Sequence, residues 1–247
     1  MQMAEQINLY ENKNEIFTDA LERVVMELYM RKERDGLKTL AFCGSEPGVG
    51  TTSIAIDVAI FMAKSGWKTL LVDADLHKKI SYKALSSKSS LGLADFLERE
   101  VPVEQLVLET NEPMLAFMPS GVAKGRPLAL FCSERMNQLI TVLNQRYDYI
   151  IFDSPALSLS TDTCILAAKT DGVVLITAYG SSNVKVLRSN VDTLKRYQIP
   201  LLGVIMNKSD KELYRSYKKD YDYFNKMRYL KNAKQPAVSK QGGKEQK

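Results

Sequence analysis

The chain has 247 residues, of which 45% are hydrophobic and 26% are charged, and this suits one large α/β domain with a full core. No apolar run approaches the roughly 18 to 20 residues that span a bilayer, and the N-terminus is too polar for a signal peptide, so we expect a cytoplasmic protein. The net charge is +5, and residues 206–247 hold 12 Lys and Arg against 5 Asp and Glu. This basic tail could meet anionic lipid, nucleic acid or an acidic partner, or it could be a solvated end.

Cysteine and histidine usage argues against two kinds of site. Cys43, Cys132 and Cys164 are widely spaced and each lies in an apolar context, which predicts reduced, buried thiols rather than a disulfide frame or a metal site. The only histidine, His77, has no partner at ligand spacing. We therefore expect neither zinc chemistry nor a Ser-His-Asp triad.

The predicted elements alternate between helix and strand along the chain. An amphipathic helix over residues 13–31 comes first, packed on its own domain or on a neighbour, followed by a strand at 40–43 and a helix at 54–64. Further strands are predicted at 68–75, 114–118, 148–155, 172–177 and 201–206, with helices at 133–145, 162–169 and 183–197. This order indicates a doubly wound, mostly parallel sheet. Residues 77–112 break the alternation, as a lid near a ligand or as a structural crossover.

Residues 42–53 read Phe-Cys-Gly-Ser-Glu-Pro-Gly-Val-Gly-Thr-Thr-Ser at a predicted strand-to-helix turn. The pattern is close to the phosphate-binding loop G-x-x-x-x-G-K-[ST], in which backbone amides and a helix N-terminus bind phosphate oxygens. Thr51 stands in the lysine position, and Thr52 stands where a hydroxyl holds Mg²⁺. The predicted nucleotide contacts are Gly48, Val49, Gly50, Thr51, Thr52 and Ser53. A purely structural glycine-rich turn is the alternative.

Three carboxylates follow predicted strands. Asp73 and Asp75 end the run at 68–75, and Asp153 ends the run at 148–155. Ligands of parallel sheets gather at the carboxyl ends of the strands, so these side chains should lie near the loop. Mg²⁺ prefers oxygen ligands. We therefore predict Asp73, Asp75 and Asp153 as catalytic residues and Thr52, Asp73 and Asp153 as the metal site, although each aspartate alone could be a turn or capping residue.

Taken in order, these motifs resemble those of the bacterial tyrosine kinases of capsule and exopolysaccharide biosynthesis, relatives of the MinD and ParA ATPases. The similarity runs over residues 15–210 and includes Gly-Leu-Ala-Asp-Phe-Leu at 92–97, Met-Pro-Ser-Gly at 118–121, Arg-Tyr-Asp-Tyr at 146–149, Thr-Asp at 161–162 and Gly-Val-Ile-Met-Asn at 203–207. The resemblance implies a P-loop NTPase fold that binds ATP and Mg²⁺. It also implies that Asp73 and Asp75 belong to the second Walker motif, Asp153 to Walker B, Asp162 to the margin of the site and Asn207 to the base.

The resemblance further implies a cytoplasmic partner of a membrane polysaccharide co-polymerase, which regulates chain length or export and reaches the membrane through that partner or through its basic tail. No specific nucleic acid is implied. The expected segments are an N-terminal helix and arm at 1–36, a P-loop kinase-like domain at 37–210 and a tyrosine-rich tail at 211–247. As phosphoacceptors we predict Tyr214, Tyr217, Tyr221, Tyr223 and Tyr229. Each phosphate would add about −1.5 to −2 charges; an amphipathic packing stripe is the alternative.

Several departures from the family leave alternatives open. Besides Thr51, Glu46 stands where MinD-type ATPases carry a second lysine, and Lys78 or Lys79 could supply the missing charge. The family's E-x-x-R-x-x-R assembly motif aligns to Glu15, Thr18 and Leu21, which leaves self-association open. The alternatives to an active kinase are a pseudokinase that serves as a nucleotide-dependent binding module and a MinD-like positioning ATPase. Asn-Lys-Ser-Asp at 207–210 also matches the N-K-x-D guanine motif of GTPases.

Overall fold

The apolar runs of the sequence form the central strands of one sheet. In this computed structural model the described residues are 6–12, 14–77, 91–99 and 101–209. The strands β2 (Thr39–Gly44), β3 (Thr69–Asp73), β6 (Tyr149–Ser154) and β7 (Gly172–Ala178) are buried along their whole length. Parallel strands covered on both faces are expected to be buried in this way.

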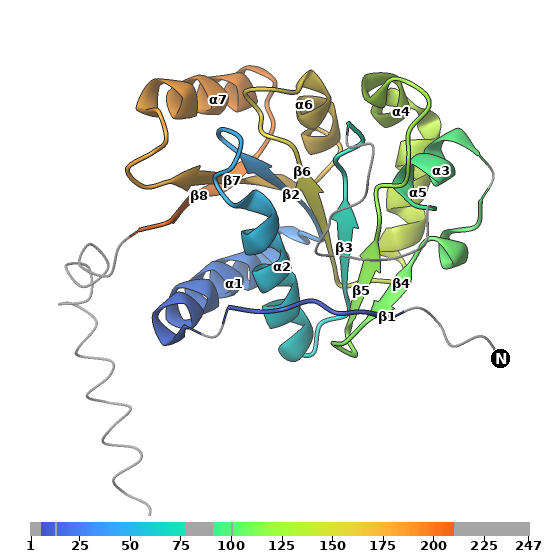
Figure 1. The fold of residues 1–247 in the computed structure, drawn as a ribbon, viewed down its shortest axis with the longest axis horizontal. Helices are drawn as coiled ribbons and strands as arrows, with labels where there is room; N and C mark the ends of the chain where they lie inside the picture. Colours follow the sequence, from blue (N-terminus) through green and yellow to red (C-terminus); the bar gives the residue numbers. More distant parts are fainter. Residues whose placement is uncertain (1–5, 13, 78–90, 100, 210–247) are drawn as a thin grey trace, which may run out of the picture. The chain divides into compact units, whose positions relative to one another are not determined.

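The sheet order confirms the doubly wound topology (Figure 1). Eight strands follow the order β1-β4-β5-β3-β6-β2-β7-β8, and among these pairs only β4 and β5 are antiparallel. The remaining strands are β1 (Gln6–Ile7), β4 (Leu108–Thr110), β5 (Leu115–Met118) and β8 (Leu201–Asn207). Because β2, β3 and β6 are parallel neighbours, their carboxyl ends meet at one edge of the sheet.

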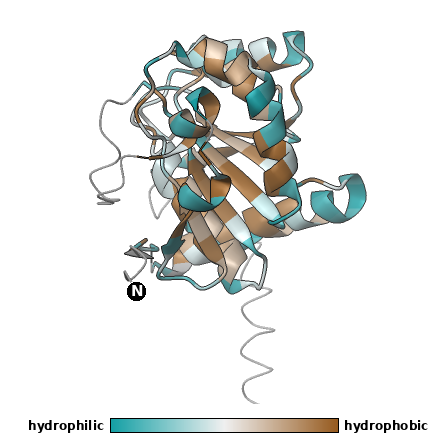
Figure 2. Ribbon diagram, turned by 90° about the vertical axis from the view of Figure 1, so that its right-hand side faces the viewer, coloured by the Kyte–Doolittle hydropathy of each residue, from teal (hydrophilic) through white to brown (hydrophobic). Residues whose placement is uncertain are grey.

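Helices cover both faces of the sheet. They are α1 (Glu15–Asp35), α2 (Thr51–Lys64), α3 (Leu93–Glu98), α4 (Pro127–Cys132), α5 (Glu134–Asn144), α6 (Thr161–Ala167) and α7 (Val184–Arg196), with a 3-10 turn at Val103–Gln105. Alternate residues of β2 divide between the faces: Leu40 and Phe42 pack with α1 and α2, whereas Ala41 and Cys43 pack with α6 and α7. Figure 2 shows the brown, apolar strands between helices whose outer faces are teal.

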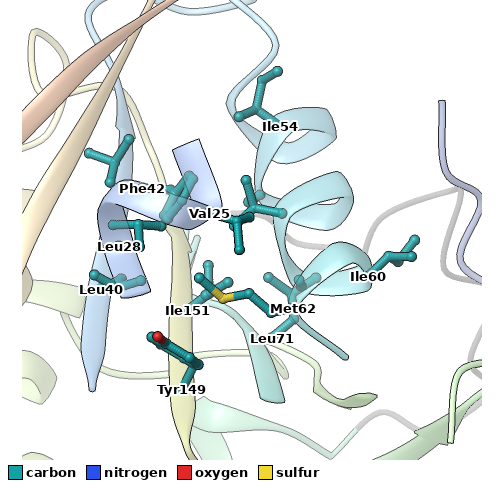
Figure 3. Close-up of a cluster of buried hydrophobic side chains, with 14 of the residues drawn as sticks. Val25, Leu28, Leu40, Phe42, Ile54, Ile60, Met62, Leu71, Tyr149 and Ile151 are labelled. Carbon is teal, nitrogen blue, oxygen red and sulfur yellow. The ribbon is translucent and has the colours of Figure 1, made fainter. Parts of the chain in front are cut away.

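The first predicted helix packs on its own domain. Its start is capped by the Asn14 side chain, which accepts the amide N–H of Ile16, and it ends at Gly36 in the left-handed conformation. Val25 and Leu28 of α1 meet α2 and the sheet in one core cluster (Figure 3). The helix therefore extends four residues beyond the predicted end, to Asp35.

The described part of residues 77–112 forms a structural crossover rather than a lid. Leu93 and Leu97 of α3 are buried in the core, as are Val103 and Leu106 beyond it. Residues 78–90 lie outside the described part of the chain. Sequence periodicity did not reveal β1, β4 or α4, because elements of two to six residues are too short to show a repeat.

The three cysteines are free thiols, and one prediction about them is wrong. Cys43 is buried, and this burial raises the pKa of its thiol to about 12. Cys164 is half-buried, but Cys132 is exposed because it ends the short surface helix α4. Among the helices of the described ranges, none combines the length and the apolar character needed to cross a membrane.

Candidate functional site

The loop between β2 and α2, residues 45–50, lies at the carboxyl edge of the sheet. Gly48 and Gly50 have φ values of 75° and 93°, in the region that favours glycine. A Cβ on Gly50 would also lie 2.3 Å from Nδ2 of Asn207. Helix α2 begins directly after this loop at Thr51, three residues before the predicted start. Backbone conformation and close packing thus both require glycine at position 50.

The carbonyl groups of this loop and of the end of β2 are held by donors from other elements. At the end of β2, the carbonyl of Gly44 accepts the amide of Leu157 at 2.9 Å. In the loop, the carbonyl of Ser45 accepts Nδ2 of Asn190 at 2.9 Å. The carbonyls of Gly48 and Val49 accept Nζ of Lys208 at 2.7 Å and Nδ2 of Asn207 at 2.9 Å. Among the described residues, the amides of Gly48, Val49 and Gly50 donate to no protein acceptor. The loop therefore keeps amide donors available for an anion.

A cavity of about 410 Å³ adjoins the loop. It is lined by Glu46, Pro47, Gly48, Gly50, Thr51, Thr52, Ser53, Asp75, Asp153, Ser154, Pro155, Ala156 and Leu159. All predicted loop contacts except Val49 are present, and the side chain of Val49 is buried in the core instead. Asp75 and Asp153 also line the cavity, so the structure brings together the phosphate loop and two of the three predicted carboxylates.

The third carboxylate, Asp73, lies beside Asp153. The two residues are register partners on the adjacent strands β3 and β6. Asp73 is buried, and its Oδ1 accepts the amide of Asp75 at 3.1 Å, which shapes the turn after β3. Ala74 N donates to the carbonyl of Asp153 at 2.8 Å. These bonds hold the two strand ends together at the cavity.

The predicted metal residues suit Mg²⁺ by their chemistry. Thr52 offers a hydroxyl oxygen at the cavity, and Asp73 and Asp153 offer carboxylate oxygens from neighbouring strand ends. Mg²⁺ usually takes one or two carboxylates and keeps several waters. Within the described ranges, no group of three or more His, Cys, Asp or Glu side chains is arranged to hold a metal. The oxygen atoms of Thr52, Asp73 and Asp153 fit a Mg²⁺ that also takes water and phosphate oxygens as ligands.

At positions 51 and 46, where related ATPases carry a lysine, this chain has no cation near the loop. A Cβ on Gly44 would lie 2.8 Å from Oγ1 of Thr51, so the Thr51 hydroxyl sits against the end of β2. Glu46 Oε2 accepts the amide of Asn183 at 2.8 Å, at the start of α7, where a helix dipole favours a negative charge. Lys78 and Lys79 lie outside the described residues.

His77 has partners that the sequence did not reveal. Its Nε2 pairs with Oδ2 of Asp162, and Ser160 Oγ donates to the same carboxylate oxygen at 2.9 Å. Ser160 Oγ also lies 3.4 Å from His77 Nε2. In a catalytic triad the serine and the carboxylate bind different ring nitrogens. Asp162 and Ser160 lie 85 and 83 residues from His77 in the sequence, so local spacing could not indicate them, and their geometry is not that of a triad.

Asn207 lies beside the loop but does not line the cavity. Its Nδ2 donates to Val49 O, and its Oδ1 accepts the amide of Lys208 at 2.8 Å. Lys208 and Asn190 were not among the predicted site residues. Asn190 is a buried polar residue on α7, and such a residue at a core-facing helical position is a usable signal. The five predicted acceptor tyrosines and Asp210 lie outside the described residues.

The chain is similar to a known protein family and to known proteins. Residues 37–181 match the family model described as an AAA domain. The chain is 32% identical over 177 residues to the tyrosine-protein kinase CpsD of Streptococcus pneumoniae serotype 4, which covers 71% of this chain and 78% of CpsD.

Two solved structures show the same fold. The chimerical protein CapA2B2 superposes with a TM-score of 0.75 at 20% identity, over 84% of this chain and 96% of that one. The septum site-determining protein MinD of Pyrococcus horikoshii OT3, complexed with Mg-ADP, superposes with a TM-score of 0.58 at 20% identity, over 72% of this chain and 76% of that one. The chain therefore belongs to the AAA-domain family and, within it, to the bacterial tyrosine-kinase family of capsular and exopolysaccharide biosynthesis.

Proposed function

We propose that the chain binds ATP with Mg²⁺ at residues 48–53 and acts as the kinase-like component of a polysaccharide export system. The observation that carries this proposal is the conformation of the loop, whose carbonyls are held by other elements while the amides of Gly48, Val49 and Gly50 stay available. Amides in this arrangement bind phosphate oxygens. Asn207 next to the loop is the proposed contact on the base side.

We propose two roles for the carboxylates, which are metal binding and proton acceptance. Thr52, Asp73 and Asp153 would hold Mg²⁺, which when bound neutralises phosphate charge. Asp75 is only half-buried and lines the cavity. We propose that it accepts the proton of an incoming hydroxyl as the γ-phosphoryl group leaves ADP. Positioning and charge stabilisation supply most of the catalysis in such transfers.

The proposed acceptors are the tyrosines of the tail. Family membership supports transfer of the γ-phosphoryl group from ATP to the hydroxyl of Tyr214, Tyr217, Tyr221, Tyr223 or Tyr229, in the same or a neighbouring copy. Each phosphate would make the basic tail less positive. We propose a membrane co-polymerase as the partner, with the cytoplasmic chain brought to the inner face of the membrane by that partner or by the unmodified tail.

A second function is supported by the two substituted lysine positions. Thr51 packs against Gly44, and Glu46 is bound at the start of α7. Removal of one charge contact can cost several kcal/mol of transition-state stabilisation, whereas ground-state binding through amides persists. A pseudokinase that switches partners with its nucleotide state is therefore the alternative to an active kinase.

One experiment separates these functions. Purified chain is incubated with γ-labelled ATP and Mg²⁺, and phosphotyrosine is mapped by mass spectrometry, with Asp153→Asn as the inactive control. Label on the tail tyrosines that disappears in the control supports the kinase. Binding of ATP without label supports the binding module. No calorimetric heat with millimolar ATP or ADP would exclude both.

A cellular test addresses the acceptors. Replacement of the five tail tyrosines by phenylalanine keeps the charge and most of the bulk but removes the hydroxyls. We expect the length or amount of polysaccharide to change. If both stay as in the wild type while the variant accumulates normally, the cluster is a docking surface and not a set of acceptors.

A further inference from the structure

Asn207, the last residue of β8, and Lys208, which follows it, both contact the phosphate loop. Lys208 has a φ of 58°, which is uncommon for a residue with a side chain and marks a conformation held by its surroundings. Its amide donates to Oδ1 of Asn207 at 2.8 Å, and the Asn207 carbonyl accepts the amide of Tyr179 at 2.8 Å. The two residues place two nitrogen donors next to residues 48 and 49.

The two donors fix the orientation of two peptide groups. Lys208 Nζ lies 2.7 Å from Gly48 O, and Asn207 Nδ2 lies 2.9 Å from Val49 O. In a trans peptide the C=O and the following N–H point in opposite directions. The amides of Val49 and Gly50 therefore point away from Lys208 and Asn207, and no acceptor among the described residues takes them.

The positive charge of Lys208 also polarises the Gly48–Val49 peptide group that it contacts. A charged donor makes a shorter and stronger hydrogen bond than a neutral one, and hydrogen bonds in series polarise one another. An ammonium group on Gly48 O thus makes the N–H of Val49 a better donor. The positive charge reaches an anion at the loop through one peptide group instead of by direct contact.

Both ends of the Asn207 side-chain amide also have partners within the protein. Its Nδ2 donates to the loop and its Oδ1 accepts the amide of Lys208, so Asn207 and Lys208, the first two residues of the N-K-x-D pattern, have a structural role that needs no guanine base. Gly50 leaves room for this contact, since a Cβ there would lie 2.3 Å from Asn207 Nδ2.

We infer that Asn207 and Lys208 are positioning residues that direct the amides of Val49 and Gly50 at the nucleotide phosphates, and that Lys208 replaces through the Gly48–Val49 peptide part of the positive charge missing at Thr51. The inference rests on the proposed nucleotide binding. Lys208 is not assigned a direct contact with the phosphates.

The test compares the affinities of four full-length proteins for Mg-ADP and for Mg-pyrophosphate by calorimetry. They are the wild type, Lys208→Met, Lys208→Arg and the control Lys195→Met, which removes an exposed lysine from the last turn of α7. We expect Lys208→Met to weaken both ligands about tenfold, and Lys208→Arg to retain most of the affinity because it keeps the charge and a donor. Lys195→Met should bind as the wild type does, and all melting temperatures should agree.

Two further measurements separate charge transfer from mere support of the loop. The affinity of the wild type should fall more steeply with salt than that of Lys208→Met, because one charge interaction is lost in the variant. Asn207→Ala should weaken binding without changing the salt dependence. Thr51→Lys placed in the Lys208→Met background should restore affinity, since it supplies the cation directly.

The outcomes that overturn the inference are distinct. If the wild type binds no nucleotide, the proposed function and the inference both fail. If the wild type binds and Lys208→Met binds equally well, only the inference fails. A loss seen with GDP but not with ADP or pyrophosphate assigns the pair to guanine recognition and overturns the inference. Equal salt dependence in the wild type and Lys208→Met overturns it as well.

Discussion

Two regions of the sheet, the starts of β2 and β3 at the amino edge and the phosphate loop at the carboxyl edge, are held by different kinds of side chain. At the amino edge, carboxylates accept backbone amides. Asp171 Oδ2 accepts the amides of Lys38 and Thr39 and the hydroxyl of Thr39 at 2.7 to 2.8 Å, and Asp148 Oδ2 accepts the amide of Lys68 at 2.8 Å. These bonds use the N–H groups where the parallel strands begin.

In the phosphate loop at the carboxyl edge, side-chain nitrogen atoms donate to backbone carbonyls instead. Asn190, Asn207 and Lys208 bind the carbonyls of the phosphate loop and leave the amides of its glycines available. The loop is therefore held from the carbonyl side, and its donors face the ligand. The comparison teaches that the phosphate loop (the binding edge) keeps its amides available, whereas the amides at the starts of β2 and β3 (the structural edge) are satisfied by carboxylates.

The largest expected loss of nucleotide affinity comes from adding a side chain at Gly50 in the phosphate loop. Gly50→Ala would place a Cβ 2.3 Å from Asn207 Nδ2 and force alanine into a φ of 93°, so the loop must move. We expect affinity for Mg-ADP to fall by more than about tenfold, measured by calorimetry.

Gly180→Ala is the matched control for that variant. Gly180 has a φ of 70° with nothing within 4 Å of the added Cβ. It should lose about 1 kcal/mol of stability without losing affinity. Unchanged affinity in a folded Gly50→Ala protein would contradict the assignment of the binding edge.

The second effect restores a cation to the binding edge. Thr51→Lys should raise ATP hydrolysis or autophosphorylation by about tenfold or more, since each 1.36 kcal/mol of barrier is a factor of ten. Thr51→Met is the control, because the methionine side chain is similar in length to lysine but carries no charge. If neither variant changes the rate, another residue already supplies the charge or the site has lost more than its lysine.

The third effect belongs to the structural edge. Asp171→Asn weakens charge-assisted hydrogen bonds to Lys38 and Thr39, so the free energy of unfolding should fall by about 1 to 2 kcal/mol. Affinity for Mg-ADP should stay unchanged. Asp192→Asn on the exposed part of α7 controls for loss of charge alone. A change of affinity in Asp171→Asn would break the division between the two edges.

The smallest effect concerns a buried carboxylate that lies on α2, away from both edges. Burial raises the pKa of Asp57 to about 6, the amide of Asn12 opposes this rise, and Glu11 adds to it. In the folded protein Asp57 thus holds its proton to higher pH than in the unfolded chain. Stability should fall as the pH rises from about 4 to 6.

Asp57→Asn keeps an acceptor for Asn12 and removes the ionisation. At pH 7 it should gain about 1 kcal/mol of stability, less than the full pKa shift would give because solvent screens part of the charge. The gain should vanish below pH 4. Urea unfolding across pH 4 to 8 checks this, and a gain that does not depend on pH would contradict the assignment to Asp57.

Much of the fold was predictable because long elements carry a periodic signal. The buried strands at 39–44, 69–73, 149–154 and 172–178 appear in the sequence as continuous apolar runs. The short elements β1, β4 and α4 are fixed by contacts instead. Leu9, for example, is held near β4 by Asn111, whose Oδ1 accepts its amide at 2.6 Å.

The candidate site divides in the same way. The sequence alone determined the glycine loop, the family and the carboxylates at the strand ends, because these depend on residue type at fixed spacing near one turn or one strand end. Only the tertiary structure decided that Lys208 binds Gly48 O across 160 positions of the chain, and that His77 meets Asp162 across 85. Such contacts depend on how strands are ordered in the sheet, and local spacing carries no information about that order.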